Sequence, residues 1–427
     1  MKKVALYSLL LIAGLIGSQV VPGFLGDAAD SVYKAVQILT MVALSYIMIG
    51  VGREFEIDKS NLKQYGWDYV VAATAAGFPW IFCCLYFVFV LIPSDFWSQW
   101  PVWKESLLAS RFAAPTSAGV LFSMLAAAGL AATWVFKKAR ILAIFDDLDT
   151  VLLMIPLKMA MVGMKWQLGI VVFVMFIMLW FGYRYLHQWR IPTSWKATLV
   201  YSFVMVAIVE AVYIASKKVD PMVPIHIEVL LPAFILGCMM AHPKPNVPPG
   251  QGHAEGHDAG QADHGHHADP AEARASTFVS AAFMLLVGLS MPSIAASLAG
   301  GAPDEGDKSG LIKHALAEHT PPMGWGTIAF HVLVVTVISN VGKMFPAFCY
   351  RREATWQERC AVAIGMWPRG EVGAGVLVIS LAYGIAGPIV VIAMLSLALN
   401  LVLTGVFIFW VKKLLASAER SGKMKAA

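Results

Sequence analysis

The sequence predicts an all-α polytopic membrane protein with about twelve transmembrane helices. Of its 427 residues, 58% are apolar and only 14% are charged, whereas roughly a quarter of the residues of a soluble domain are charged. Apolar windows of about 20 residues, each long enough to cross the hydrocarbon core, recur along the chain. Because no long polar stretch is available to form a soluble core, we expect one integral membrane unit.

The apolar windows place the expected membrane segments at residues 4–22, 31–52, 67–92, 105–130, 138–162, 166–186, 196–216, 225–241, 276–297, 326–348, 358–383 and 386–414. The first window follows two lysines, as in a secretory signal, but no small-x-small cleavage site leads into a hydrophilic stretch. We therefore expect it to be retained as a helix. The expected organisation is an N-terminal bundle, a cytoplasmic linker, a C-terminal bundle and a cytoplasmic tail, at 1–241, 242–275, 276–415 and 416–427.

Loop charges predict the orientation of the helices through the positive-inside rule. With a cytoplasmic N-terminus, basic residues fall on the cytoplasmic side at 137–140, at 184–196, at 350–359 and in the tail from residue 412. The acidic residues Asp27, Asp30 and 304–307 then lie outside, and Lys217-Lys218 is the exception. We expect a multi-pass protein of a bacterial inner membrane with both termini in the cytoplasm.

Two of the expected segments are interrupted by helix breakers. Ala113 to Gly119 reads Ala-Ala-Pro-Thr-Ser-Ala-Gly, and Met366 to Gly373 reads Met-Trp-Pro-Arg-Gly-Glu-Val-Gly. Proline and glycine at membrane depth free backbone groups, which are tolerated only against protein or water. A pair of broken helices, one in each half of a chain, is typical of a transporter site. The alternative is a proline kink in an ordinary helix bundle.

Asp146 and Asp147 lie inside the expected segment 138–162. A carboxylate near the bilayer centre costs several kcal/mol, so it usually faces a cavity and has a function. Consecutive side chains point about 100° apart, so one aspartate can face a cavity while the other turns toward a neighbouring helix. Desolvation and mutual repulsion favour the binding of a proton. A cation competes for the same charge, which is antiport in its simplest form. Alternatively, the pair marks the cytoplasmic end of a shorter helix.

Other charged residues accompany this pair. Asp149 lies on a similar face to Asp146 and is either a third polar group of the cavity or a charge in its vestibule. Lys343 is either the buried partner of the aspartates or an interfacial lysine. Arg369 and Glu371 are expected to satisfy each other or nearby helices.

Three further ionisable residues lie within or beside the expected segments. Lys158 is expected to extend toward the outer interface. Glu210 and Glu228 either line a cavity or bind across an interface. Glu228, beside His226, is expected at an interface, and Glu210 is left unassigned.

The motifs, taken in order, resemble those of bacterial monovalent cation/proton antiporters, the sodium/proton antiporters of the Asp–Asp electrogenic type. They include a Pro-Arg-Gly-Glu signature, an Asp–Asp helix, a Gly-Lys helix and a Thr-Ser break, at 365–373, 145–147, 342–343 and 116–117. The resemblance runs from roughly residue 31 to residue 410. The ordered set is more specific than any single motif.

The resemblance implies a core domain in which two broken helices of inverted repeats cross near the midplane, and a separate domain that forms a homodimer. It implies that Asp147 is the main cation and proton ligand. Asp146 would pair with Lys343, which releases it as the cation binds, and Thr116 and Ser117 would help to complete the site. In the family, an Asp–Asp pair is associated with electrogenic exchange.

The chain departs from the family pattern at two positions. Asp149 stands where small or apolar residues are usual, and Trp367 precedes the signature proline. These departures leave the hydration and the ion preference of the cavity open.

Residues 242–274 carry six of the eleven histidines among Gly, Ala, Asp and Pro, so disorder is expected there. They are a flexible tether, a pH-responsive segment or a weak site for transition metals. The histidines available to a metal are His253, His257, His264, His266 and His267. Because they form no compact motif, we expect no structural metal.

The sequence thus predicts a secondary antiporter that exchanges Na⁺ or Li⁺ for protons and contributes to pH homeostasis. It is expected to work in membrane lipid without a cofactor, enzymatic catalysis or nucleic acid. Potassium/proton exchange is the alternative in the same class. From other classes, the alternatives are a membrane sensor or channel-like protein on an antiporter scaffold, and a transition-metal transporter.

Overall fold

The structure is a computed structural model that describes residues 2–55, 62–163, 165–219, 225, 227–241, 270–292, 316, 319–321, 323–383, 385 and 387–420. Within this part of the chain every regular element is helical, and the only β-pairing is an isolated bridge between Trp189 and Met240. The run of histidines at 253–267 lies outside the described residues, as does His226.

In the first half of the chain the α-helices are α1 (Lys2–Leu25), α2 (Ala29–Arg53), α3 (Leu62–Tyr86), α4 (Trp100–Ser110), α5 (Ala118–Ala127), α6 (Trp134–Val162), α7 (Trp166–Arg184) and α8 (Trp195–Val219). Short elements adjoin them, namely η1 (Gly26–Ala28), η3 (Phe87–Leu91), η4 (Ser94–Phe96) and η5 (Arg111–Ala113). The second half contains α9 (Leu230–Met239), α10 (Pro270–Leu289), α13 (Trp325–Gly342), α14 (Phe345–Phe348), α15 (Trp356–Gly365), α16 (Glu371–Ala382) and α17 (Pro388–Arg420).

Each expected membrane segment overlaps at least one of these helices. Among the described residues, eight helical stretches are long and apolar enough to cross a membrane. The two interrupted segments are divided into shorter helices, α4 with α5 and α15 with α16. The chain is therefore an all-α polytopic membrane protein, as the sequence predicts.

Several helix boundaries differ from the expected ones, and three of the differences have a clear local reason. α9 begins at Leu230 rather than at residue 225, because Pro232 has no N–H to donate and is therefore tolerated in the first turn of a helix but not in its interior. α10 begins at Pro270, a residue type favoured at the first helical position, so residues 270–275 belong to the helix and not to the linker. α17 continues to Arg420, into the expected tail, because no helix breaker precedes that residue after the membrane segment.

The two broken helices meet at their breaks. The backbone N–H of Ser117, just before α5, donates to the carbonyl oxygen of Pro368 between α15 and α16, at 3.0 Å. Pro115 and Pro368 lack an N–H and disfavour helical geometry at the residue before them, which ends each first half-helix. Backbone groups freed by one break thus find partners at the other, as membrane depth requires.

The order of helix, broken helix and helix occurs twice, as α3, α4–α5, α6 and as α13, α15–α16, α17. α3 packs on α6, α13 packs on α17, and the two groups meet where α3 packs on α13. Since α3 is the third membrane segment and α13 is the tenth, the two groups cross the membrane in opposite directions. This arrangement is that of an inverted repeat.

Glycines allow two helix pairs to approach closely. A side chain at Gly52 of α2 would collide with the backbone of α9 at Phe234 and Gly237, and one at Gly14 of α1 would collide with α10 at Gly288. Small residues at such crossings are typical of membrane helices, where association depends on close packing. α1 with α10 and α2 with α9 therefore form a tightly packed layer beside the repeated groups.

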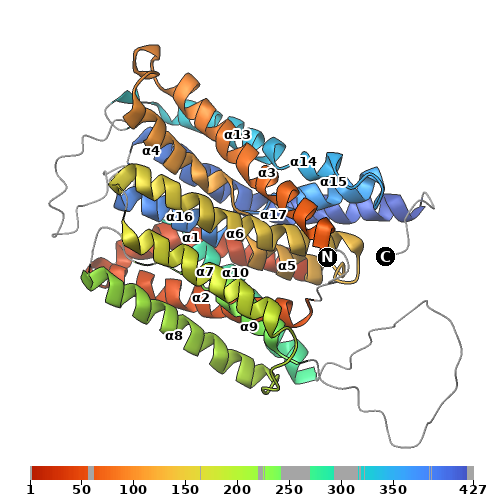
Figure 1. The fold of residues 1–427 in the computed structure, drawn as a ribbon. Coiled ribbons are helices and arrows are strands. Elements are labelled where there is room, and N and C mark those ends of the chain that lie inside the picture. The colour runs from red at the N-terminus through yellow and green to blue at the C-terminus, as the bar shows by residue number, and fades with distance from the viewer. Residues whose placement is uncertain are drawn as a thin grey trace, which may run out of the picture.

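The start of α1 and the end of α17 lie at the same end of the bundle (Figure 1). α2 returns to this end, where both ring nitrogens of His187 lie 3.1 Å from carbonyl oxygens, those of Phe55 and of Met240. α9 therefore finishes at the end that holds both termini. Residues just before α9 lie toward the opposite end of the bundle.

Candidate ion-binding site

α6 carries all three aspartates of the candidate site without interruption from Trp134 to Val162. Asp146 is 0% exposed, Asp147 is 7% exposed and Asp149 is 5% exposed. The interpretation of the pair as the cytoplasmic end of a shorter helix is therefore wrong, because α6 already begins at Trp134, about three turns before the pair. α6 holds its carboxylates at depth inside the bundle.

Asp146 is paired with a lysine from another helix. Lys343, directly after α13, places Nζ 2.8 Å from Oδ2 of Asp146, and both side chains are 0% exposed. The backbone N–H of Thr116 donates to the same carboxylate oxygen at 2.7 Å. Lys343 is thus a buried partner and not an interfacial lysine.

The hydroxyl groups of the first break hold the two broken helices together. Thr116 Oγ1 donates to the carbonyl oxygen of Met366 at 3.1 Å and accepts from Lys343 at 2.7 Å. Ser117 Oγ donates to Oε2 of Glu371 at 2.5 Å. It also accepts from the backbone N–H of Val120, so Ser117 is the N-cap of α5. Both hydroxyls already have a donor and an acceptor, and the structure places them at the crossing.

Asp147 has a different environment from its neighbour. Neither of its carboxylate oxygens has a hydrogen-bond partner in the structure, although both are buried. The side chain lines a cavity of about 20 Å³, which is enough for one water molecule. A buried carboxylate without partners is costly and rare, so this position is suited to receive a proton or a cation.

Arg369 fixes the second break against two other elements. Its Nε donates to the carbonyl oxygen of Ala113 at 2.9 Å, and Nη2 donates to that of Ser339 at 2.9 Å. Its Nη1 donates to Oδ1 of Asn340 at 2.7 Å. Glu371 bonds to Ser117 instead. In the part of the chain that the structure describes, Arg369 and Glu371 therefore bond to nearby elements and not to each other.

The comparison with known families agrees with this architecture. A family model described as sodium/hydrogen exchanger, transmembrane, matches residues 2–414. The chain belongs to the sodium/hydrogen exchanger family. A search of curated proteins gave no match. The family makes the chain a multi-pass membrane transporter that exchanges monovalent cations for protons.

Asp149 lies away from the cavity at Asp147 in this exchanger. Its Oδ1 accepts from the hydroxyl of Tyr69 at 3.3 Å, and its backbone carbonyl accepts from Nη2 of Arg111 at 3.2 Å. It is not among the residues that line the cavity. The structure therefore does not bring the third aspartate together with the candidate ligand.

Sequence reasoning missed Arg111, which is 0% exposed. Its guanidinium carbon lies 4.5 Å from the centre of the Trp80 ring, and its Nε and Nη1 have no hydrogen-bond partner. The available signal was an arginine within an expected membrane segment, directly before the first break. Arg111 places a buried positive charge near Asp149 and Asp146 of the exchanger.

For Glu228 the structure favours the alternative, a cavity, over the expected interface. It lines the cavity of Asp147 together with Ile144, Leu148, Thr150, Leu230, Leu231 and Val372. No sequence pattern around it points to this cavity, because the contact depends on where the chain enters α9. Glu210 and Lys158 are half-buried on α8 and α6, and neither is among the residues that line this cavity.

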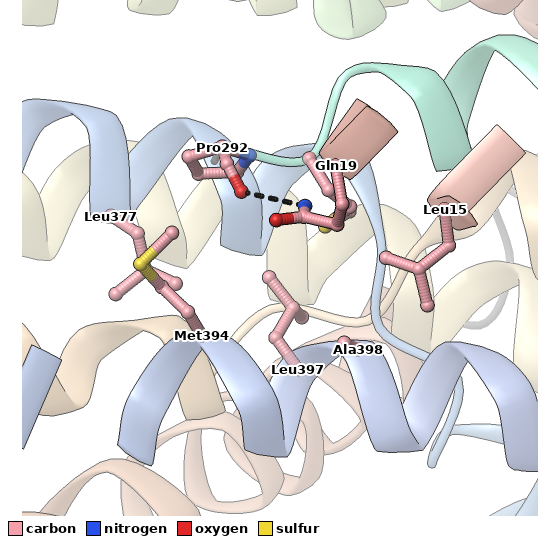
Figure 2. A pocket seen from close by; sticks show the side chains of 8 residues that line it. Leu15, Gln19, Pro292, Leu377, Met394, Leu397 and Ala398 are labelled. Atoms are coloured by element: carbon pink, nitrogen blue, oxygen red, sulfur yellow. Dashed lines mark hydrogen bonds between the residues drawn. The ribbon is translucent and has the colours of Figure 1, made fainter. Parts of the chain in front are cut away.

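A second small cavity of the exchanger lies where α1, α16, α17 and the end of α10 meet (Figure 2). Leu15, Leu377, Met394 and Leu397 line it with apolar groups, and the amide of Gln19 donates to the carbonyl oxygen of Pro292 at 3.2 Å. It contains no charged side chain. It is therefore no candidate for an ion site.

The predicted weak metal site at the histidines falls outside the described residues. Among the residues that the structure does describe, no group of three or more His, Cys, Asp or Glu side chains is placed to hold a metal ion. The metal prediction for 253–267 remains a prediction.

Proposed function

We propose that this exchanger moves Na⁺ or Li⁺ in exchange for protons, and that Asp147 is the group that binds both. The observation that carries the proposal is the pair of unpartnered, buried oxygens on Asp147 beside a cavity of about 20 Å³. Thr116, Ser117 and Asp146 already have partners, whereas Asp147 has none in the structure.

Exchange follows from the cost of leaving this carboxylate charged and unpaired. A proton and a monovalent cation each neutralise the single negative charge, so binding of one displaces the other. A charged, unoccupied carboxylate at membrane depth costs several kcal/mol, so reorientation with an occupied site is favoured over reorientation with an empty one. This difference couples the two fluxes without any covalent chemistry or cofactor.

Asp146 and Lys343 form the coupling pair in this proposal. While Lys343 holds Asp146, the local charge of the site is carried by Asp147. When the cation binds, Lys343 releases Asp146, whose Oδ1 is already without a partner, and that carboxylate contributes to the cation's environment. Electrogenic exchange also requires a second proton for each cation, and the released Asp146 is the carboxylate available to take it up when the cation leaves, so we propose electrogenic exchange.

The description of the matching family as sodium/hydrogen exchanger supports Na⁺ and Li⁺ as the substrates. A space of about 20 Å³ admits one water-sized group, so a bound cation exchanges much of its hydration shell for oxygen ligands. We place the exchanger in a bacterial inner membrane with both termini cytoplasmic and with a role in pH homeostasis. The shared end of α1 and α17 supports the placement of the termini, and we propose a homodimer.

The test is transport by purified protein in proteoliposomes that contain a pH-sensitive dye, with the membrane voltage clamped by an ionophore. Addition of Na⁺ or Li⁺ should collapse a preset proton gradient in the wild type, and Asp147→Asn should abolish this response. Asp149→Asn is the matched control, because it makes the same change on the same helix away from the cavity.

The other outcomes identify the alternatives. A response to K⁺ but not to Na⁺ would show potassium/proton exchange, and a response to Zn²⁺ would show transition-metal transport. Proton flux without any dependence on a cation would show a channel-like leak, and no flux at all would favour a sensor. Unchanged exchange in Asp147→Asn would overturn the assignment of the site.

A further inference from the structure

Glu228 is a second acidic side chain at the cavity of Asp147. It comes from the stretch before α9, whereas Asp147 comes from α6 and Val372 on the same cavity wall comes from α16. Asp147 interacts electrostatically with Asp146, Glu371 and Glu228 as like charges and with Lys343 as an opposite charge. Lys343 is bound to Asp146, and the described lining of the cavity contains two acidic side chains and no basic one.

Glu228 lies on one definite side of Asp147. It interacts electrostatically with Asp147 and also with Lys158, further along α6. Residues 147 and 158 are separated by about 16 Å on a helix that rises 1.5 Å per residue. The opposite end of α9, at Met240, lies at the end of the bundle that holds both termini. With cytoplasmic termini, Glu228 is on the outer side of the site.

Glu228 shares the cavity with Asp147, whose two carboxylate oxygens are buried and without partners.

We propose that Glu228 is a cation-recruiting residue, which attracts monovalent cations from the outer side into the cavity of Asp147. The inference rests on the proposed function and adds an outer-side determinant of cation affinity to it. A negative charge beside a cavity with low-dielectric walls raises the local concentration of cations there. Among the described charged groups, Asp147 and Glu371 add to the attraction, and Lys158 opposes it.

The primary test compares cation kinetics from the two sides of the membrane. Glu228→Gln and Glu228→Asp are reconstituted in a defined orientation, and the apparent KM and Vmax for Na⁺ are measured with Na⁺ added on either side. We expect Glu228→Gln to raise the outer KM roughly threefold to tenfold, with an inner KM and a Vmax within about twofold of the wild type. Glu228→Asp should restore most of the affinity.

Glu210→Gln is the matched control for this experiment. Glu210 is also half-buried in the membrane region but lies on α8, outside the residues that line the cavity. We expect its KM on both sides to equal that of the wild type. An equal rise of KM on both sides in Glu228→Gln, or a fall in Vmax at unchanged KM, would overturn the recruiting role.

A second variant keeps the test informative if Glu228→Gln folds poorly. The five native cysteines are all buried, so Glu228→Cys provides a thiol for thiosulfonate reagents of either charge. A negatively charged label should lower the outer KM, and a positively charged label should raise it. The same effect from both labels would show that size and not charge matters, and would overturn the proposal.

Failure of this inference is distinguishable from failure of the proposed function. If Asp147→Asn abolishes exchange while Glu228→Gln leaves the outer KM unchanged, only the recruiting role is wrong. If Asp147→Asn still exchanges Na⁺ for protons, the binding site itself is wrong, and the role of Glu228 falls with it.

Discussion

Lys343 and Asp146 form an ion pair of 2.8 Å, with both side chains fully buried, directly beside an aspartate that has no partner. The contrast arises from one residue of helical rotation, which turns Asp146 toward α13 and the first break and turns Asp147 toward the cavity. Two adjacent carboxylates on one helix therefore have separate environments and separate roles.

Removing one member of this pair should destabilise the protein more than removing both charges. Lys343→Met leaves Asp146 buried without its cation, and loss of one partner of a buried pair costs about 3–5 kcal/mol. The double variant Asp146→Asn with Lys343→Met leaves no uncompensated charge at this pair and should recover a large part of that loss. Thermal unfolding in detergent measures both. A double variant that is no more stable than Lys343→Met would contradict this prediction.

Arg369→Lys should lower stability although the charge is retained. Arg369 donates from three different nitrogens to Ala113, Ser339 and Asn340, and a lysine ammonium cannot reproduce this planar geometry. Each buried acceptor left without a donor costs about 1–3 kcal/mol. The control is Arg351→Lys at an exposed position, which we expect to leave thermal unfolding unchanged. A similar melting temperature in both variants would show that the hydrogen bonds of Arg369 to Ala113, Ser339 and Asn340 do not stabilise the broken helices.

The features of this protein that the sequence predicts well are those whose residues carry a large free-energy cost inside a membrane segment. Charged residues and helix breakers inside apolar segments are costly wherever they occur, so the aspartate pair and both breaks are visible without a structure. The bond between Ser117 and Pro368 follows the same reasoning, because each break leaves backbone groups that need partners.

Residues whose role depends on the path of a loop are not visible in this way. Glu228 reaches the cavity because α9 is short and starts at Leu230, and nothing in the local sequence specifies that depth. The partners of Asp149 and Arg369 likewise come from distant helices, α3 and α13 among them. The sequence indicated that these side chains need partners but did not identify which ones.

Gly52→Val should weaken the packing of α2 on α9. A side chain at Gly52 would collide with the backbone of α9 at Phe234, which has no freedom to move away. Overpacking of this kind costs typically 1–3 kcal/mol, and here the obstacle is backbone. Gly50→Val on the same helix is the matched control, because nothing lies within 4 Å of a side chain there. Thermal unfolding in detergent should separate the two, and equal losses would refute the close approach.

Asp149→Asn should leave the cation affinity of the exchanger close to that of the wild type while lowering its stability. The carboxylate contacts Tyr69 and lies beside the buried Arg111. The substitution therefore removes the negative charge that balances this guanidinium, and it does not remove a ligand of the cation. We expect a loss of roughly 1–3 kcal/mol in the free energy of unfolding.

The measurements for Asp149→Asn are the apparent KM for Na⁺ and Li⁺ in proteoliposomes and the melting temperature of the same preparation. Tyr69→Phe is the control for the lost hydrogen bond, because it removes the donor and keeps the charge of Asp149. If the charge is what matters, Tyr69→Phe should lower stability less than Asp149→Asn does. A change in the preference between Na⁺ and Li⁺ in Asp149→Asn would instead place this carboxylate in the ion's environment, because only a group that contacts the ion or its water distinguishes two cations of equal charge.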